Sequence, residues 1–116
     1  MQYMLLIYEP EAGFVGEAGQ ARLMEVVGKH MALAKEMREA GAMQSGSGLQ
    51  PVTTATTIIT NGGGQTLHDG PFAETREQLG GYYLIDVADL DTALGYARRI
   101  PVVDGGKVEV RPLATY

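Results

Sequence analysis

The sequence predicts a single α+β domain, built as a split βαββαβ unit that carries an extra β-hairpin. Short apolar runs rich in strand formers alternate with two segments whose apolar residues recur at the helical spacing of three and four. A turn sequence, Asn61-Gly62-Gly63-Gly64, separates two of the short runs and indicates a hairpin. Because 116 residues is a common length for one domain, we expect one domain over residues 1–116.

The first strand is expected at residues 2–8, QYMLLIY. This run is too short for a typical helix, is rich in strand formers and is followed by Pro10. Its alternating positions are apolar on both faces, with Tyr3, Leu5 and Ile7 on one face and Met4, Leu6 and Tyr8 on the other. A strand of this kind needs cover on both sides.

A long helix is expected over residues 18–40. Its apolar positions follow the helical period and form one stripe, made of Leu23, Val26, Val27, His30, Leu33, Ala34 and Met37. Gly41 then stops the helix, as a glycine at this position commonly does. The stripe is expected to face the sheet.

The middle of the chain is expected to hold the inserted hairpin. Residues 42–50, AMQSGSGLQ, indicate a weak, glycine-interrupted strand that ends before Pro51. Residues 55–60 and 65–68 flank the glycine-rich turn and are the two strands of the hairpin.

The last third of the chain predicts strand, helix and strand. Residues 82–87, YYLIDV, are the strongest strand signal, and residues 107–113 alternate apolar and charged positions. Between them, Asp89 is expected to cap a helix from Leu90 to Arg99, before Pro101. The inward residues of this helix are expected to be Leu90, Ala93, Leu94 and Ala97.

This order of elements also predicts a homodimer. Right-handed crossovers place both helices on the same face of the sheet, so the other face is uncovered. Since residues 2–8 are apolar on both faces, a second copy of the sheet is the simplest cover. We therefore expect a symmetric dimer whose sheets face each other.

The charge and the N-terminus exclude several classes of partner. Fourteen acidic and nine basic residues give a net charge of −5, which repels nucleic-acid phosphates and anionic membranes. The pair Arg98-Arg99 is expected at a helix end, where cations are favoured without a ligand. The first residues lack the basic start and the apolar length of a signal peptide or membrane span, so a cytoplasmic protein is expected.

His30 is the first candidate for chemistry. It falls on the apolar stripe of the long helix, so its imidazole is expected to point toward the sheet. Two interpretations stay open: a histidine satisfied within the core, or an imidazole whose proton affinity is adjusted near neutral pH.

Asp69 is the second candidate, within the stretch HDGPFAETREQLGG at residues 68–81. An Asp before Gly70-Pro71 is typical of a turn in which the carboxylate binds nearby backbone amides. The alternative is a carboxylate at the sheet edge that orients the imidazole of His30 for acid–base work.

The other polar residues near this turn carry weaker signals. Glu74 and Glu77 are explained as solvated residues or as the start of a short helical turn. A metal held by His30, His68, Asp69 and Glu74 would use suitable residue types. However, no two of them have the spacing that presents paired ligands on a helix, so the signal for a metal site is weak and no residue is assigned as a metal ligand.

At this point the chain resembles a known family. The segment HDGPFAETREQLGGYYLIDVADLDTALGYARRIP is similar to the signature of the DGPF group of YCII-related proteins, and MQYMLLIY and KVEVRPL are similar to that family's two ends. The resemblance implies a ferredoxin-like fold that assembles as a dimeric α/β barrel. It also implies a polar pair between helix and sheet, in which Asp69 matches the motif aspartate and His30 the helix histidine.

The resemblance implies two kinds of function. One branch of the wider family eliminates chloride from a hydroxylated aromatic, which is proton transfer that an Asp-His pair can carry out without a cofactor. A lyase or isomerase with a small-molecule pocket is therefore expected, with His30 and Asp69 as catalytic residues and Tyr8, Phe72 and Tyr82 as its wall. The alternative is a noncatalytic regulatory module, because DGPF proteins often lie beside, or fused to, extracytoplasmic-function sigma factors. A metal-assisted site is a third possibility.

Overall fold

The computed structural model describes residues 1–73 and 75–116. It has a mixed α+β architecture, as the sequence predicted. Its elements are β1 (Gln2–Glu9), η1 (Glu11–Phe14), α1 (Gly16–Glu39), β2 (Met43–Gly48), η2 (Val52–Thr54), β3 (Thr56–Asn61), β4 (Gly64–Asp69), β5 (Gln78–Asp86), α2 (Leu90–Ala97) and β6 (Lys107–Pro112). The short helices η1 and η2 were not expected from the sequence.

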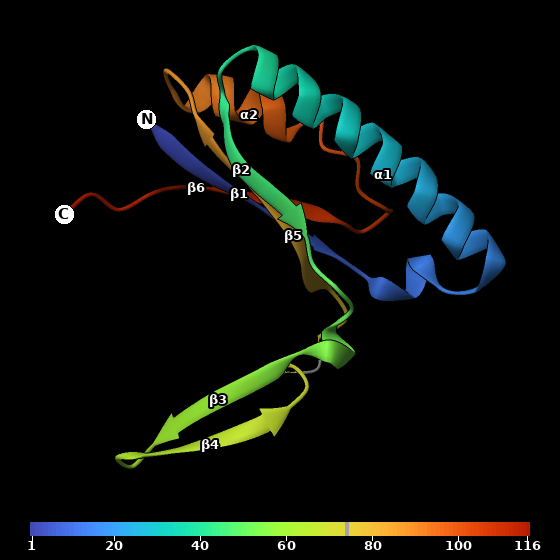
Figure 1. Ribbon diagram of the computed structural model, residues 1–116, viewed down its shortest axis with the longest axis vertical. Helices are drawn as coiled ribbons and strands as arrows, with labels where there is room; N and C mark the ends of the chain where they lie inside the picture. Colours follow the sequence, from blue (N-terminus) through green and yellow to red (C-terminus); the bar gives the residue numbers. More distant parts are fainter. Residues whose placement is uncertain (74) are drawn as a thin grey trace.

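The main sheet has four strands in the order β2-β5-β1-β6, and its neighbouring strands run antiparallel. The apolar strand β1 lies between β5 and β6, where Leu5 pairs with Tyr83 on one side and Val110 on the other. Both helices lie on one side of this sheet (Figure 1).

The core lies between this side of the sheet and the two helices. Its buried residues include Tyr3, Leu5, Ile7, Tyr83 and Ile85 from the sheet, Leu33, Ala34 and Met37 from α1, and Ala93 and Ala97 from α2. Leu5, Met37 and Ile85 are fully buried. Burying large apolar side chains such as these stabilises the fold by roughly 1.5 to 3 kcal/mol each.

Helix α1 is packed along only part of its length, which corrects the expectation of one continuous buried stripe. Its C-terminal half supplies Leu33, Ala34 and Met37 to the core, whereas Val27 is 40% exposed. A helix of 24 residues is about 36 Å long. The strands of the sheet have six to nine residues and span only about 20 to 30 Å, so the helix is longer than the sheet that it covers.

Helix α2 begins at the expected cap. The Asp89 carboxylate accepts hydrogen bonds from the backbone N–H and the hydroxyl of Thr92, both at 2.8 Å. Ala93 and Ala97 are buried as predicted, but Leu90 is 48% exposed, which corrects its expected inward position. The two small alanines make the contact with the core, and Leu90, in the first turn, lies outside it.

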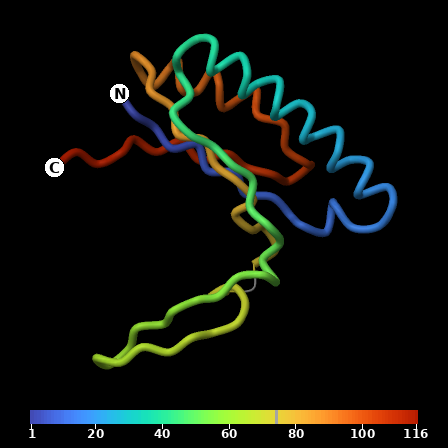
Figure 2. Tube along the Cα trace, in the orientation of Figure 1, coloured from blue at the N-terminus to red at the C-terminus, as the bar shows by residue number. Residues whose placement is uncertain are grey.

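Strands β3 and β4 form a separate two-stranded sheet that projects from the main body, and we call residues 56–69 the arm (Figures 1 and 2). The arm turns at Gly62 and Gly63, whose positive φ angles of 58° and 82° suit glycine. At its base, Gly70 N–H donates to the Ala55 carbonyl at 2.7 Å, and the Thr57 hydroxyl donates to the Gly70 carbonyl at 2.8 Å.

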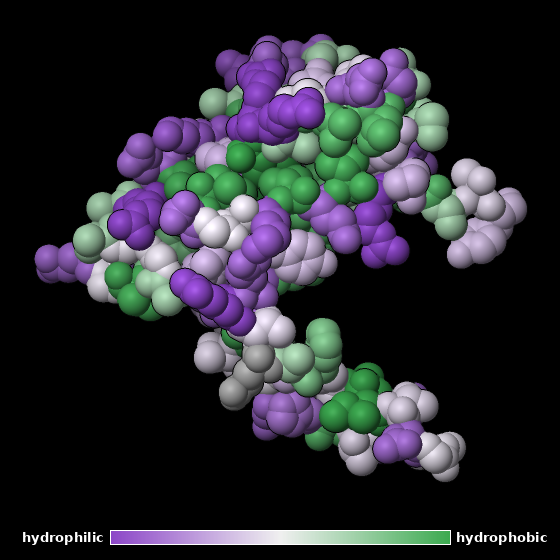
Figure 3. All heavy atoms as spheres, turned by 180° about the vertical axis from the view of Figure 1, so that it is seen from behind, coloured by the Kyte–Doolittle hydropathy of each residue, from purple (hydrophilic) through white to green (hydrophobic). Residues whose placement is uncertain are grey.

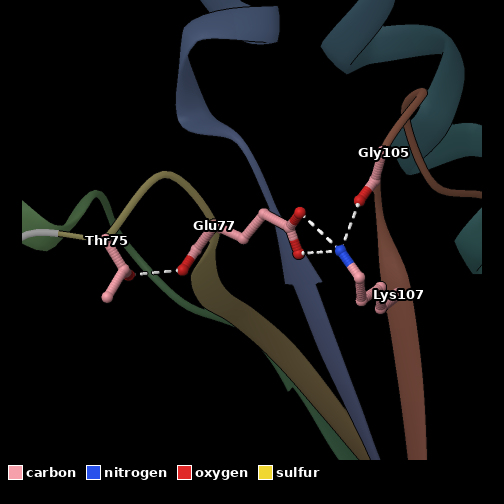
Figure 4. A network of polar contacts seen from close by, with 4 residues as sticks. All are labelled: Thr75, Glu77, Gly105 and Lys107. Carbon is pink, nitrogen blue, oxygen red and sulfur yellow. Dashed lines mark hydrogen bonds and ion pairs between the residues drawn. The ribbon is translucent and has the colours of Figure 1, made fainter.

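A polar network fixes the chain where it leaves the arm and enters β5 (Figure 4). The Lys107 ammonium donates to both carboxylate oxygens of Glu77 and to the Gly105 carbonyl at 3.2 Å. The Thr75 hydroxyl donates to the Glu77 carbonyl. Glu77 therefore connects the start of β5 to the start of β6. This corrects both interpretations from the sequence, a freely solvated side chain and the start of a helical turn. Glu74 lies outside the described residues.

Candidate functional site

An open cleft of about 1140 Å³ lies between α1 and the sheet. The helix wall includes Leu23, Val26, Val27, His30 and Met31, the sheet floor includes Ile7, Gly46 and Tyr83, and Leu49 and Pro51 close one end. Most of these side chains are apolar. A large, mainly apolar hollow with a few polar groups is the usual form of a small-molecule site.

His30 and Tyr83 form the polar centre of the cleft. His30 lies on α1 and Tyr83 on β5, and the Nδ1 atom of His30 is 2.8 Å from the Tyr83 hydroxyl oxygen. The two rings are stacked, with centroids 5.9 Å apart and planes at 30°. Tyr83 is buried and His30 half-buried. The pair therefore joins helix to sheet through both a hydrogen bond and ring contact.

Burial holds both members of this pair in their neutral forms. It lowers the pKa of His30 from its usual value of 6.5, and the Pro101 backbone opposes this only in part. Burial also raises the pKa of Tyr83 above its usual value of 10, against the opposing charge of Arg38. At neutral pH the imidazole can thus act as a base while the phenol remains a hydrogen-bond donor.

Gly46 makes room for the tyrosine ring. A Cβ atom at this position would lie 2.7 Å from Cδ1 of Tyr83 and 2.9 Å from the terminal methyl carbon of Met43. The glycine-interrupted sequence of β2 is therefore required where the strand passes Tyr83. It leaves space for the Tyr83 ring beside β2.

The charged residues of the cleft differ in how they are used. Glu9 accepts from the Val103 N–H at 2.8 Å and Glu11 from the Val52 N–H at 2.9 Å, so both carboxylates serve the backbone. Arg38 lines the same cleft, and its guanidinium donates to the Met43 sulfur at 3.7 Å. Within the described residues no carboxylate pairs with Arg38. A positive charge therefore remains available beside the His30–Tyr83 pair.

The residues expected from the sequence are only partly brought together. His30 and Tyr82 line the cleft, but Tyr8, Asp69 and Phe72 are not among its lining residues. Asp69 is exposed at the end of β4, and Phe72 is 85% exposed just beyond the arm. The hydrogen bond found for the His30 ring joins it to Tyr83, not to Asp69.

The sequence analysis assigned Tyr82 to the pocket, whereas the structure places the neighbouring Tyr83 beside His30. Alternation along β5 places Tyr83 on the same face as Ile85, beneath the helices, and Tyr82 on the opposite face. The Tyr82 hydroxyl lies 3.3 Å from Ser45 Oγ. To predict the contact between Tyr83 and the imidazole, one must know how α1 lies over β5. The alternating pattern of a strand does not contain this information.

The part of the chain that the structure describes contains no group of three or more His, Cys, Asp or Glu side chains placed to hold a metal ion. Of the four residues considered as ligands, His68 and Asp69 lie on the arm and His30 in the cleft, while Glu74 is outside the described residues. Over the same residues, no helix has the length and apolar character needed to cross a membrane.

Two comparisons with known proteins agree with the resemblance seen in the sequence. The family model for the YCII-related domain matches residues 1–115. An uncharacterized protein of Rhizobium meliloti (strain 1021) is 41% identical over 119 residues, covering 100% of this chain and 94% of that protein. The chain belongs to the YCII-related domain family.

Proposed function

We propose that this chain is a cytoplasmic homodimer of the DGPF type that binds a small, mainly apolar molecule in each cleft and moves a proton at His30. The reaction class is that of a lyase or isomerase that needs no cofactor. The observation that carries this proposal is a neutral imidazole hydrogen-bonded to a buried tyrosine at the centre of an apolar cleft.

The chemistry follows from the two groups. In the tautomer whose Nδ1–H donates to the Tyr83 oxygen, Nε2 of His30 carries the lone pair that accepts a proton from the ligand, in place of the contact of the ring with the Pro101 backbone. The Tyr83 hydroxyl, which donates to the His30 carbonyl at 3.5 Å in the chain without ligand, then donates to an oxygen of the ligand that gains negative charge. Arg38, which has no paired carboxylate among the described residues, favours a ligand that carries an acidic group.

Asp69 keeps its proposed role as the carboxylate partner of the imidazole. Because the one N–H of the neutral ring goes to Tyr83, Asp69 would accept from Nε2–H once His30 has taken up a proton. In a single chain it lies outside the lining of the cleft, so this role requires that a second copy bring it there. Tyr82 borders the cleft within one chain, although alternation along β5 places its side chain on the opposite face of the sheet. Tyr8 and Phe72 contribute only if dimer formation places them at the cleft.

The proposed dimer is a dimeric α/β barrel of two ferredoxin-like units. The strand order β2-β5-β1-β6, with two helices on one side of the sheet, supports the ferredoxin-like part of this proposal. The other side of the sheet carries Met4, Leu6, Tyr82 and Leu84, which are only half-buried. A second sheet would cover them, as apolar positions on both faces of a strand require.

The test is an NMR titration of the two imidazoles with benzoate and, as a neutral match, benzamide. Benzoate is expected to shift the His30 signals and leave those of His68, which lies on the exposed arm, unchanged. Benzamide should shift them less, because it lacks the charge that Arg38 attracts. Tyr83→Phe should change the His30 titration, and Asp69→Asn should do so only if the two residues meet in the dimer. A His30 signal that is indifferent to both probes contradicts the proposal.

The second candidate is a noncatalytic regulatory module that contacts an extracytoplasmic-function sigma factor. The exposed apolar side chains of the arm favour a protein contact, since patches of this kind commonly mark interaction sites. This candidate predicts a co-purifying sigma factor and an Asp69→Asn variant with lower stability and unchanged chemistry. The imidazole titration separates the two candidates.

A further inference from the structure

The arm presents an apolar face that its own chain leaves open. Ile58 and Leu67 lie directly opposite each other on β3 and β4 and are 61% and 74% exposed. Phe72, just beyond the arm, is 85% exposed. A two-stranded hairpin without a packed face is marginally stable in water. The arm therefore needs a surface to pack against.

The main body of the same chain does not supply this surface. Every residue of β4 is exposed, and in β3 only Thr57 is half-buried. The backbone bonds that hold the arm are at its base, between Gly70 and Ala55. Figure 3 shows the arm standing away from the body, with apolar residues on both.

The exposed area of the chain points to a subunit of a larger assembly. The accessible surface is 7939 Å², whereas a compact monomer of 12.4 kDa exposes about 6100 Å², which leaves an excess of about 1800 Å². The radius of gyration is 16.0 Å, against about 13 Å for a compact domain of this length. A stable complex buries about 800 Å² on each partner, so the excess is ample for one.

The occupant that fits both open surfaces is a second copy of this chain. Besides the arm, the mouth of the cleft exposes apolar side chains, with Val27 at 40%, Leu49 at 49% and Met31 at 66%. In a dimer with a twofold axis, the arm of each copy can pack against the cleft of the other. The same contact then covers the apolar face of the arm and the mouth of the cleft.

We infer that the arm of one copy packs its Ile58–Leu67 face against the mouth of the cleft in a second copy, beside Met31. This inference rests on the proposed homodimer and specifies that the arm of one copy contacts helix α1 of the other. Asp69 lies on the same face of the arm as Leu67, because residues two apart in a strand share a face. The exchange therefore brings Asp69 of one copy to the cleft that holds His30 of the other.

Disulfide cross-linking tests this contact cleanly because the chain contains no cysteine. Leu67→Cys is mixed with a differently tagged Met31→Cys, the two are allowed to exchange subunits, and the mixture is oxidised. The matched control replaces Met31→Cys with Lys29→Cys, which is also exposed on α1 but does not line the cleft. We expect a disulfide between the two tags with Met31→Cys and none with Lys29→Cys.

The alternative results are distinct. A dimer by sedimentation that gives no Leu67–Met31 disulfide, or that joins Leu67 only to its own counterpart, overturns the arm exchange and leaves the benzoate test of the cleft standing. A monomer overturns both the exchange and the proposed dimer. A protein other than this chain on the arm, such as a sigma factor, also overturns the exchange.

A second variant identifies the face of the arm that is used. Leu67→Ser is expected to raise the dimer dissociation constant at least tenfold, whereas Ile59→Ser, on the opposite face, should change it less than twofold. Both side chains are exposed, so neither change disturbs the core. Equal effects of the two changes would show that the assigned face is wrong.

Discussion

The half-buried imidazole of His30 links protonation to the stability of the fold. Burial lowers its pKa in the folded chain below the 6.5 of an unfolded chain. Between these two values the unfolded state binds more protons, so the free energy of unfolding rises with pH. This stability is fully present above the unfolded pKa and is lost as the pH falls toward the folded pKa.

Urea unfolding of His30→Gln checks this coupling. From about pH 7.5 to about pH 5, the wild type should lose more stability than the variant, because glutamine removes the titrating group. His68→Gln is the matched control, since His68 lies on the exposed arm, and it should keep the wild-type dependence. Identical pH profiles for wild type and His30→Gln would mean that the imidazole is not held neutral by the fold.

At this scale the sequence identified the histidine but not its partner. The helical period placed His30 on the inner stripe, and the structure has it facing the sheet. Tyr83 required knowledge of which strand lies beneath this turn of α1. The approach of Gly46 to the tyrosine ring depends on the pairing of β2 with β5, which is a tertiary contact and leaves no local pattern.

Helix α1 has two halves with different attachment. Met37, in its C-terminal half, is fully buried, whereas Val27, on the same stripe in its N-terminal half, is 40% exposed. The N-terminal half contacts η1, where Gly19 is buried and Gln20 donates to the Phe14 carbonyl at 3.1 Å. The contact between α1 and the hydrophobic core is therefore concentrated at the C-terminal end.

Truncating one residue of the stripe in each half measures this difference. Met37→Ala should cost about 2 to 5 kcal/mol, because it removes apolar burial and leaves a cavity. Val27→Ala, at a 40% exposed site on the same stripe, should stay within about 0.5 kcal/mol of wild type. Both values come from chemical denaturation. Similar losses at the two positions would contradict the one-ended packing against the core.

The sequence predicted the elements well because each has a local signal. The expected α1, α2 and hairpin turn appear within a few residues of their predicted bounds. Leu90 and Val27 were assigned inward because periodicity gives the side of a helix but not how far the neighbouring sheet extends. The length of a helix is set by its own sequence, whereas the burial of its side chains is set by the extent of the sheet beneath it.

The whole molecule leaves one side of its main sheet without a helix. Within the described residues, both helices pack on the side of Leu5, and the opposite side carries Leu6 and Leu84. Cross-strand pairing places Leu6 beside Tyr82 and Glu109. An apolar centre flanked by charge suits a contact between two sheets.

A charge at the centre of this face should prevent the proposed dimer. Leu6→Glu is expected to give a folded monomer, because a buried unpaired carboxylate is costly and Glu109 lies on the neighbouring strand. Leu90→Glu, the same change at an exposed leucine on α2, should leave the dimer intact. Sedimentation equilibrium with circular dichroism distinguishes loss of assembly from loss of fold. A dimeric Leu6→Glu would place the interface elsewhere.

The order of elements could be predicted from local patterns, but the direction of the arm could not. The turn at residues 61–64 fixes that a hairpin forms, and nothing in it fixes where the hairpin points. Asp69 was therefore expected near His30 from its motif, whereas the arm holds it outside the cleft of its own chain. If the site is assembled from two copies, as proposed, the sequence pattern of one chain does not reveal which residues meet.

The one-ended attachment of α1 divides the helix into segments of unequal local stability. The turns around Met37 can open only when the core opens, whereas the turns around Val27 can open while the sheet stays intact. Leu23, Val26 and Val27, which line the cleft, belong to the less stable segment. A ligand that fills the cleft therefore acts as the missing part of the core, and its binding slows amide hydrogen exchange in the free half of the helix.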